Sequence, residues 1–318
     1  MKSEFIFNAD GIGNHCHGAS IAEHNKSVFC VWYGYSEKEY EGGQICLAQY
    51  DSKTEKWTKG RSIFPNLAGS NCGNPIIYSD KKNKILNIYF VILAKHYWDS
   101  AKIYHSYSND DGENWSPPIP LNTDEGIMIR HRPYELDENT ILIPAYDEKS
   151  NVSIIYKSRF PFDKWELYTK IDGNFIQGDM IAFNENELQI YLRPALDTPL
   201  YIYRALSPDK GKTFSTIIKT SLFSPLSGVA AIKLKNKGVL VCHNHTDKFK
   251  RTPLTLSYVK DKEVVYNQLV NLEESDMEFS YPQMIELENS EIHIVYTYNR
   301  KMIKHVKLSN NFRSEHVL

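Results

Sequence analysis

A polar turn that ends in an aromatic residue recurs along this chain, and its recurrence limits the folds that the chain can adopt. The clearest copy, Ser108–Trp115, reads Ser-Asn-Asp-Asp-Gly-Glu-Asn-Trp. Gly112 permits a left-handed backbone conformation, Asp110 can accept hydrogen bonds from nearby amides, and Trp115 can bury its ring beneath the loop. We therefore expect a stiff turn between two strands, with a structural rather than a chemical role.

Other copies of this turn lie at a nearly constant interval. The best second copy is Ser207–Phe214, and weaker copies begin at Tyr50, Ser158 and Ser257. The five starts, at residues 50, 108, 158, 207 and 257, are therefore 58, 50, 49 and 50 residues apart. The candidate first strands of the repeating units begin at a similar interval, at His17, Asn74, Arg132, Gly178, Gly228 and Tyr281.

These units are built from short runs, four to a complete unit, that are rich in β-branched and aromatic residues and are separated by turns. Repeats of about 50 residues with this content are typical of propeller blades. The sequence therefore predicts an all-β fold, a six-bladed β-propeller of four-stranded antiparallel blades that forms one domain over residues 1–318. The last unit runs out of residues after Val306–Leu308, so we expect Glu4–Phe7 to supply its missing strand and close the ring.

The charge, hydropathy and cysteines of the chain argue against several classes of partner and site. A formal net charge of -2 gives no excess of basic residues for a nucleic-acid or anionic-membrane partner. No apolar stretch approaches the length that spans a bilayer, and the first residues carry no cleavage signal, so we expect a cytoplasmic protein, or a secreted one if a leader has been removed. The 5 cysteines are scattered without Cys-x-x-Cys spacing, which predicts buried thiols rather than a disulfide framework or a zinc site. We expect no cofactor and no bound metal.

Several phrases outside these turns carry a resemblance that spans nearly the whole chain. They are His17-Gly-Ala-Ser-Ile, Trp32-Tyr-Gly-Tyr, Asn74-Pro, Arg251-Thr-Pro-Leu-Thr, Tyr281-Pro and the segment from Tyr296 to His305. Together with the repeated turns, which correspond to Asp boxes, these phrases resemble the sialidase superfamily, specifically its branch with degenerate BNR repeats. The resemblance implies an exo-acting glycoside hydrolase whose partner is an acidic carbohydrate or glycoconjugate.

Sialidases grip the carboxylate of the substrate with three arginines and use a tyrosine nucleophile, with a glutamate as its base and an aspartate as acid/base. By resemblance, Arg193 and Arg251 match the second and third of these arginines, and Tyr281 matches the nucleophile. The residue types suit this chemistry, because a planar guanidinium offers paired donors to a carboxylate. A neutral phenol can also attack beside that carboxylate without the repulsion that an anionic nucleophile would meet.

The chain departs from the family pattern at several positions. His17 stands where the first arginine would open the first blade, and Gln177 stands where the base glutamate would open the fourth. Glutamine cannot take a proton from a tyrosine, but Asp179 follows two residues later and would share its strand face, so it is a candidate substitute. Arg132 is a candidate for the missing guanidinium, with His17 as the alternative. The loop that would carry the acid/base offers three glutamates and no aspartate, and Glu41 is our candidate for that role.

These departures leave two further hypotheses open. A histidine near a tyrosine suits proton abstraction beside a uronate carboxylate, as in lyases that share propeller folds, and His17 and Tyr281 would then handle the protons. Alternatively, the loss of family residues at positions 17 and 177 fits a propeller that binds carbohydrate without turning it over. All three hypotheses involve an acidic sugar.

Overall fold

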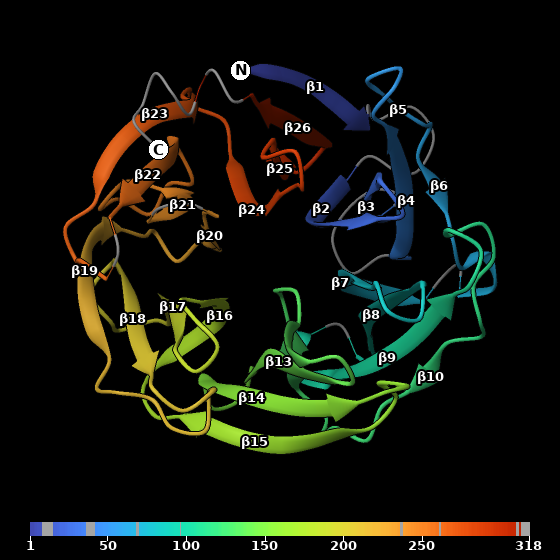
Figure 1. Ribbon diagram of the computed structural model, residues 1–318, viewed down its shortest axis with the longest axis horizontal. Helices are drawn as coiled ribbons and strands as arrows, with labels where there is room; N and C mark the ends of the chain where they lie inside the picture. Colours follow the sequence, from blue (N-terminus) through green and yellow to red (C-terminus); the bar gives the residue numbers. More distant parts are fainter. Residues whose placement is uncertain are drawn as a thin grey trace.

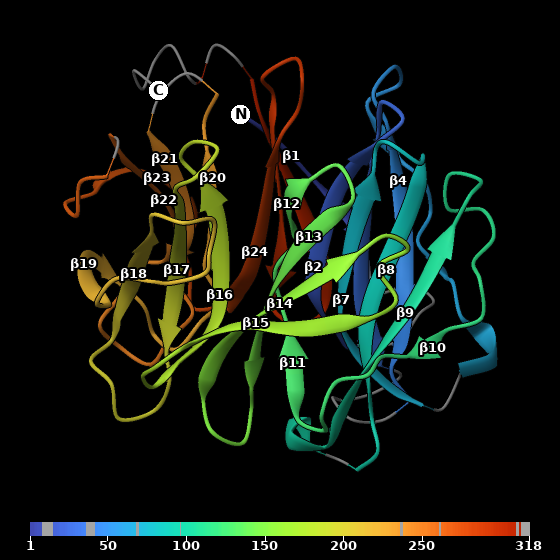
Figure 2. The ribbon, with the colours of Figure 1, turned by 60° about the horizontal axis from the view of Figure 1, so that its bottom comes forward.

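Six antiparallel sheets stand in a ring around a central axis in the part of the chain that the structure describes, which is residues 1–7, 15–35, 42–67, 70–95, 97–235, 238–260, 262–309 and 312. The structure is a computed structural model, and Figure 1 shows it along this axis. The sheets follow one another in chain order, so each sheet is one blade, and the six-bladed β-propeller that the sequence predicts is confirmed. In Figure 2 the inner strands run roughly along the axis.

Within each blade, the first strand lies nearest the axis and the later strands follow outward. The first three blades consist of β2 (His15–His24), β3 (Ser27–Tyr35), β4 (Gln44–Asp51) and β5 (Lys56–Trp57), with β6 (Arg61–Ser62) also on β4; then β7 (Asn71–Asp80), β8 (Ile85–Leu93), β9 (Ala101–Ser108) and β10 (Ile119–Pro120); then β11 (Ile127–Ile129), β13 (Thr140–Asp147), β14 (Val152–Arg159) and β15 (Trp165–Ile171), with β12 (Tyr134–Asp137) also on β13.

The other three blades follow the same order. They consist of β16 (Phe175–Ala182), β17 (Leu188–Pro194), β18 (Tyr201–Ser207) and β19 (Ile218–Phe223); then β20 (Ala230–Lys233), β21 (Val239–Asn244), β22 (Leu254–Val259) and β23 (Asn267–Glu273); then β24 (Phe279–Glu286), β25 (Ile292–Tyr298), β26 (Met302–Leu308) and β1 (Lys2–Phe7). Two short 3-10 helices, η1 (Pro65–Leu67) and η2 (Trp98–Ser100), lie in connections.

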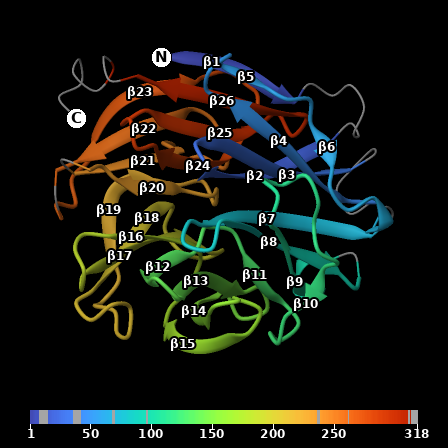
Figure 3. The same ribbon diagram turned by 45° about the vertical axis from the view of Figure 1, so that its right-hand side comes forward.

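The ring closes between the two ends of the chain. Strand β1 pairs with β26 in antiparallel register, with Glu4 opposite His305 and Lys2 opposite Lys307. It is therefore the outermost strand of the sixth blade, and Figure 3 shows it beside β26. The predicted closure by an N-terminal strand is confirmed, and the strand begins two residues earlier than expected, at Lys2.

The apolar core of the ring is divided among the interfaces between neighbouring blades. Between the first two blades, for example, Phe29 and Val31 of β3 belong to one buried cluster with Ile88 and Phe90 of β8. Among the described residues, similar clusters join each of the other neighbouring pairs, including the sixth blade and the first. Because both faces of a blade are covered in this way, each blade depends on its neighbours to bury its apolar side chains.

The two clearest copies of the polar turn have the geometry that the sequence predicts. In the turn after β9, Ser108 Oγ accepts a hydrogen bond from Gly112 N at 2.9 Å, and Asp110 Oδ1 accepts one from Asn114 N at 2.9 Å. The copy after β18 repeats both bonds, and its Gly211 has a φ of 82°, close to the 83° of Gly112. Both turns join the third and fourth strands of a blade, away from the axis, so their aspartates do not belong to an axial site.

All five cysteines are buried, as the sequence predicts for structural thiols. Among the described residues, no helix is long and apolar enough to cross a bilayer. In the same part of the chain, no group of three or more His, Cys, Asp or Glu side chains could hold a metal ion.

Candidate functional site

The innermost strands of four blades contain the same irregularity. The pairing register shifts between residues three apart, at His17/Ser20, Gly73/Ile76, Ile176/Asp179 and Ser280/Gln283. In each strand the residue just inside the shift has a positive φ, which is 63° for Gly18, 42° for Asn74, 54° for Gln177 and 53° for Tyr281. A side chain larger than glycine adopts such a conformation at a cost of about 1–3 kcal/mol, and both bulges and strain of this kind are common beside active sites.

These bulges surround a cavity of about 270 Å³ at the end of the ring where the innermost strands begin. Its lining brings together five residues that the sequence predicts, namely His17, Gln177, Arg193, Arg251 and Tyr281. The lining also includes Tyr146, Glu148 and Arg300, and all six blades contribute to it. The cavity on the axis is therefore the candidate active site.

Among the residues that line the cavity are three arginines, each from a different blade. Arg193 Nη1 donates to the hydroxyl of Tyr281 at 3.4 Å, and the guanidinium carbon of Arg251 lies 5.0 Å from the centre of the Tyr281 ring. Arg251 Nη1 and Arg300 Nε each contact one oxygen of Glu278, at 3.0 Å and 2.9 Å. Glu278 thereby holds two guanidinium groups in position. Burial opposes the ionisation of Glu278, but Arg251 and Arg300 outweigh burial and lower its pKa.

The hydroxyl of Tyr281 is more acidic than an ordinary phenol. Burial by itself would raise its pKa, but the positive charges of Arg251 and Arg193 outweigh burial and lower the pKa to about 8. A hydrogen bond with Gln177 and the charge of Arg130 act in the same direction. Arg130 is fully buried against Tyr281, and its Nη2 donates to the backbone oxygen of Tyr281 at 2.7 Å.

Gln177 lies beside Tyr281 but cannot act as its base, because an amide does not take up a proton at these pH values. Its Nε2 donates to the hydroxyl of Tyr146 at 3.3 Å, and its side chain also forms a hydrogen bond with Tyr281. A donor to the charged form of a phenol lowers the pKa of that phenol. Tyr146 differs from Tyr281, since burial raises its pKa. Of the two phenols that contact Gln177, Tyr281 is the acidic one.

His17 is a neutral group packed against Tyr281. The two ring centres are 4.5 Å apart and the rings are nearly perpendicular. Burial and the charges of Arg300 and Arg251 hold the pKa of His17 well below its usual value. His17 therefore cannot supply the positive charge that an arginine would supply at this position. Its Nδ1 is buried and has no hydrogen-bond partner among the described residues.

Asp179 does not line this cavity, so its predicted placement beside Tyr281 is wrong. The bulge between Ile176 and Asp179 interrupts the alternation of strand faces, and Asp179 consequently does not share a face with Gln177. Asp179 Oδ2 instead accepts a hydrogen bond from Ala231 N at 2.7 Å. Burial raises the pKa of Asp179 to about 6, although the charges of nearby arginines oppose this rise. The residues with positive φ show that the predicted first-strand entries are one residue off in the first and fourth blades. The entry predicted at Arg132 is wrong, because the innermost strand of the third blade, β11, ends at Ile129.

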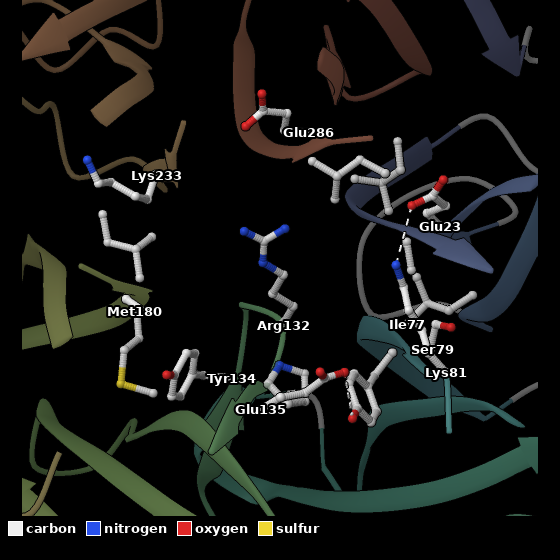
Figure 4. Close-up of a pocket in the computed structure, with 17 residues that line it drawn as sticks. Glu23, Ile77, Ser79, Lys81, Arg132, Tyr134, Glu135, Met180, Lys233 and Glu286 are labelled. Atoms are coloured by element: carbon white, nitrogen blue, oxygen red, sulfur yellow. Dashed lines mark hydrogen bonds and ion pairs between the residues drawn. The ribbon is translucent and has the colours of Figure 1, made fainter. Parts of the chain in front are cut away.

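Arg132 lies in a different cavity, at the end of the ring where the innermost strands finish (Figure 4). The prediction that Arg132 lies beside Tyr281 as a third guanidinium is therefore wrong. The segment after β11 carries Arg130 to the backbone of Tyr281 and Arg132 to the backbone oxygen of Met284, which Arg132 Nη1 contacts at 3.1 Å. Glu41, the predicted acid/base, lies outside the described residues.

Arg300 and Glu148 are the cavity residues with charged side chains that sequence reasoning missed. Arg300 lies between β25 and β26, and Glu148 lies between β13 and β14, so both are in turns that join the second and third strands of a blade. Such turns return to the end of the ring where the first strands begin, and this topology is the signal that could have found them. Burial raises the pKa of Glu148, although the charge of Arg193 opposes the rise.

Comparisons with known proteins agree with this architecture. A family described as "BNR repeat-like domain" matches residues 26–294. Among solved structures, the Hadza microbial sialidase Hz136 matches with a TM-score of 0.83 at 16% sequence identity, over 97% of this chain and 68% of that one. The leech intramolecular trans-sialidase matches with a TM-score of 0.76 at 11% identity, over 98% and 71%. A protein of unknown function from Dyadobacter fermentans matches with a TM-score of 0.80 at 15% identity, over 96% and 97%. No match was found among curated proteins. Identities this low show a shared fold.

Proposed function

Because this chain belongs to the BNR repeat-like domain family, we propose that it is a sialidase-like glycosidase that removes a terminal sugar bearing a carboxylate. The observation that carries this proposal is the cluster of arginines around one acidic phenol. Arg193 lies 3.4 Å from the hydroxyl of Tyr281, and Arg251 and Arg300 line the same cavity.

In this proposal, Arg193, Arg251 and Arg300 bind the carboxylate of the sugar. A guanidinium can donate two parallel hydrogen bonds to a carboxylate, and charge-assisted bonds of this kind are about twice as strong as neutral ones. A sugar without the carboxylate would lose these charge-assisted hydrogen bonds in a partly buried site, which costs binding energy. The arginines would therefore select for the acidic sugar as well as orient it.

Tyr281 is the proposed nucleophile. Its hydroxyl oxygen would attack the anomeric carbon and form a tyrosyl–sugar bond as the bond to the leaving oxygen breaks, and water would then release the sugar. Since Gln177 cannot take the proton, ionisation would depend on the low pKa of Tyr281, and Gln177 would stabilise the phenolate by donating a hydrogen bond. Glu148 is the proposed proton donor to the leaving oxygen, because its raised pKa favours the protonated form. Glu41, which the family pattern favours, is the alternative donor.

Aryl glycosides of sialic acids, other nonulosonic acids and uronic acids would test this function. We expect the protein to hydrolyse at least one of them and to leave the matching neutral glycoside intact. Tyr281→Phe should lower kcat at least about a thousandfold, because it removes the attacking oxygen. Tyr107→Phe is the matched control, since Tyr107 is 43% exposed on β9, and it should change neither kcat nor KM. Full activity in Tyr281→Phe would end the assignment of the nucleophile.

A second candidate function is the cleavage of uronate-containing glycans by elimination, and the contact between His17 and Tyr281 favours it. Neutral His17, with its Nδ1 unpartnered among the described residues, would accept the proton next to the uronate carboxylate while the arginines hold that carboxylate. The product would be an unsaturated sugar that absorbs near-ultraviolet light. Such absorbance during turnover, lost in His17→Asn, would support the lyase, and turnover without it would exclude the lyase.

The third candidate, a propeller that binds an acidic sugar without turnover, is favoured by the amide of Gln177 in place of a base. This candidate would be supported if calorimetry shows that a sialic acid or uronic acid binds, if Tyr281→Phe still binds it, and if no product forms on long incubation. Any turnover that requires Tyr281 would exclude it.

A further inference from the structure

A second cavity, of about 530 Å³, lies at the opposite end of the ring from Tyr281. Its walls come from the last residues of the innermost strands, including Ile21 of β2, Ile77 of β7, Met180 of β16 and Ile285 of β24. The volume is within the range of about 300–1,000 Å³ that is usual for small-molecule sites. The glycosidase proposal makes no use of this cavity.

Arg132 is the central polar group of the second cavity. Figure 4 shows its side chain in the middle of the cavity, with Lys233, Met180 and Glu286 around it. Its Nη1 donates to the backbone oxygen of Met284 at 3.1 Å. No carboxylate of the described residues forms an ion pair with it, and a guanidinium has five N–H donors. Most of the hydrogen-bonding capacity of Arg132 is therefore available to a ligand.

The carboxylates near Arg132 are held by other groups. Asp179 is buried, feels the charge of Arg132, and accepts a hydrogen bond from Ala231 N at 2.7 Å. Glu23 lies 3.5 Å from Lys81 Nζ, and Glu286 accepts a hydrogen bond from a backbone amide at 2.9 Å. Glu135 accepts a hydrogen bond from a tyrosine hydroxyl at 3.1 Å. These three glutamates line the cavity together with Lys81 and Lys233, so the lining carries no excess of positive charge for a ligand with several negative charges and fits one with a single charge that reaches Arg132.

The rest of the lining is largely apolar. Ile77, Met180, Ile181 and Ile285 are buried and also face the cavity. A ligand that covers these side chains would gain about 25 cal/mol for each Å² of apolar surface that it removes from water. The combination of one available guanidinium and an apolar wall is typical of sites for organic acids rather than for inorganic anions.

We propose that the second cavity binds a small organic monoanion, with its carboxylate on Arg132 and its apolar body against Ile77, Met180 and Ile285. The paired donors of the guanidinium match the geometry of a carboxylate. This site is separate from the arginine cluster around Tyr281, and its function does not depend on the glycosidase activity.

Isothermal titration calorimetry with phenylbutyrate, its neutral analogue phenylbutanol and the dianion phenyl phosphate tests this proposal. We expect phenylbutyrate to bind at least about tenfold more tightly than either of the other two probes. Arg132→Met should weaken phenylbutyrate about tenfold to a hundredfold and leave phenylbutanol within about twofold, because it removes the charge and keeps an apolar side chain. Ala182→Leu, which fills the cavity from another blade without a change in charge, should weaken both ligands.

Two controls separate this site from the rest of the surface. Arg159→Met removes an exposed arginine on β14 and should not change the affinity for phenylbutyrate. Arg193→Met removes an arginine from the first cavity and should leave unchanged the part of the binding that Arg132→Met weakens. The proposal is overturned if phenylbutyrate does not bind, if Arg132→Met and Ala182→Leu both leave its affinity unchanged, or if Arg193→Met alone weakens it. Since these measurements do not involve turnover, their outcome is independent of the glycosidase assays.

Discussion

Replacing Arg193 by methionine should raise the pKa of Tyr281 from about 8 toward the usual value of a phenol. Methionine keeps an unbranched apolar side chain of similar length, so the change removes mainly the positive charge. Arg251 has a larger effect on the pKa of Tyr281 than Arg193 does, but Arg251 is bound to Glu278. Its removal would also alter that carboxylate, whereas the removal of Arg193 isolates one contact.

The distance between Arg193 Nη1 and the hydroxyl oxygen of Tyr281, 3.4 Å, sets the size of the effect. For two unit charges at this distance and an effective dielectric constant of about 20, Coulomb's law gives about 5 kcal/mol. The charge of a guanidinium is delocalised over three nitrogens and the cavity admits water, so we expect less than half of this value, about 2 kcal/mol. That energy corresponds to a rise of about 1.5 pKa units.

Ultraviolet difference titration can measure this shift. The chain contains 21 tyrosines, so the titration of a Tyr281→Phe variant is subtracted from that of the protein with Tyr281, once with Arg193 present and once with Arg193→Met. Arg159→Met, at an exposed position on β14, is the control and should leave the Tyr281 pKa unchanged. A Tyr281 pKa that stays within about half a unit after Arg193→Met would refute the electrostatic reasoning.

Three further substitutions test other parts of the structure. The pKa of Asp179 is raised from 3.8 to about 6. The contribution of Asp179 to stability is therefore fully present below its unfolded pKa and is lost as the pH rises through 6. Asp179→Asn should raise the free energy of unfolding, measured by urea denaturation, by about 3 kcal/mol near pH 8 but not near pH 4. Glu278→Gln should raise KM for an acidic aryl glycoside about tenfold with a smaller change in kcat, because Arg251 and Arg300 lose the carboxylate that positions them; an effect on kcat alone would contradict this role. Gly112→Ala should lower the free energy of unfolding by about 1–2 kcal/mol, since alanine is strained at a positive φ, and unchanged urea denaturation would contradict the importance of this turn.

The fold could be predicted because its repeating signals are local. A turn such as Ser108–Trp115 needs glycine where φ is positive and aspartate where backbone amides need an acceptor, so its residues mark the turn wherever they recur. The interval between copies then gives the blade, and the shortage of residues after Leu308 predicts that the N-terminal strand completes the last blade. None of these steps requires knowledge of contacts between distant residues.

The candidate site was predicted only in part, because it depends on bulges that the sequence does not mark. In a regular strand, residues 177 and 179 would share a face, and this rule wrongly placed Asp179 beside Tyr281. Gln177 and Tyr281 adopt a positive φ, although neither residue type favours it, so no local propensity predicts the bulge. Arg300 and Glu148 reach the cavity from turns, and only the path of the blade brings them there.

The two clearest departures from the sialidase pattern compensate each other in charge. A neutral His17 in place of an arginine removes one positive charge, and Gln177 in place of a glutamate removes one negative charge, so these two replacements offset each other at these two positions. The effect on Tyr281 is different, because a glutamate would raise the pKa of the phenol and accept its proton, whereas Gln177 donates a hydrogen bond and lowers that pKa. The nucleophile would then be activated by its positive surroundings instead of by a base. A bound carboxylate would neutralise part of the same positive charge, so under the proposed function substrate recognition and activation of Tyr281 would depend on one set of arginines.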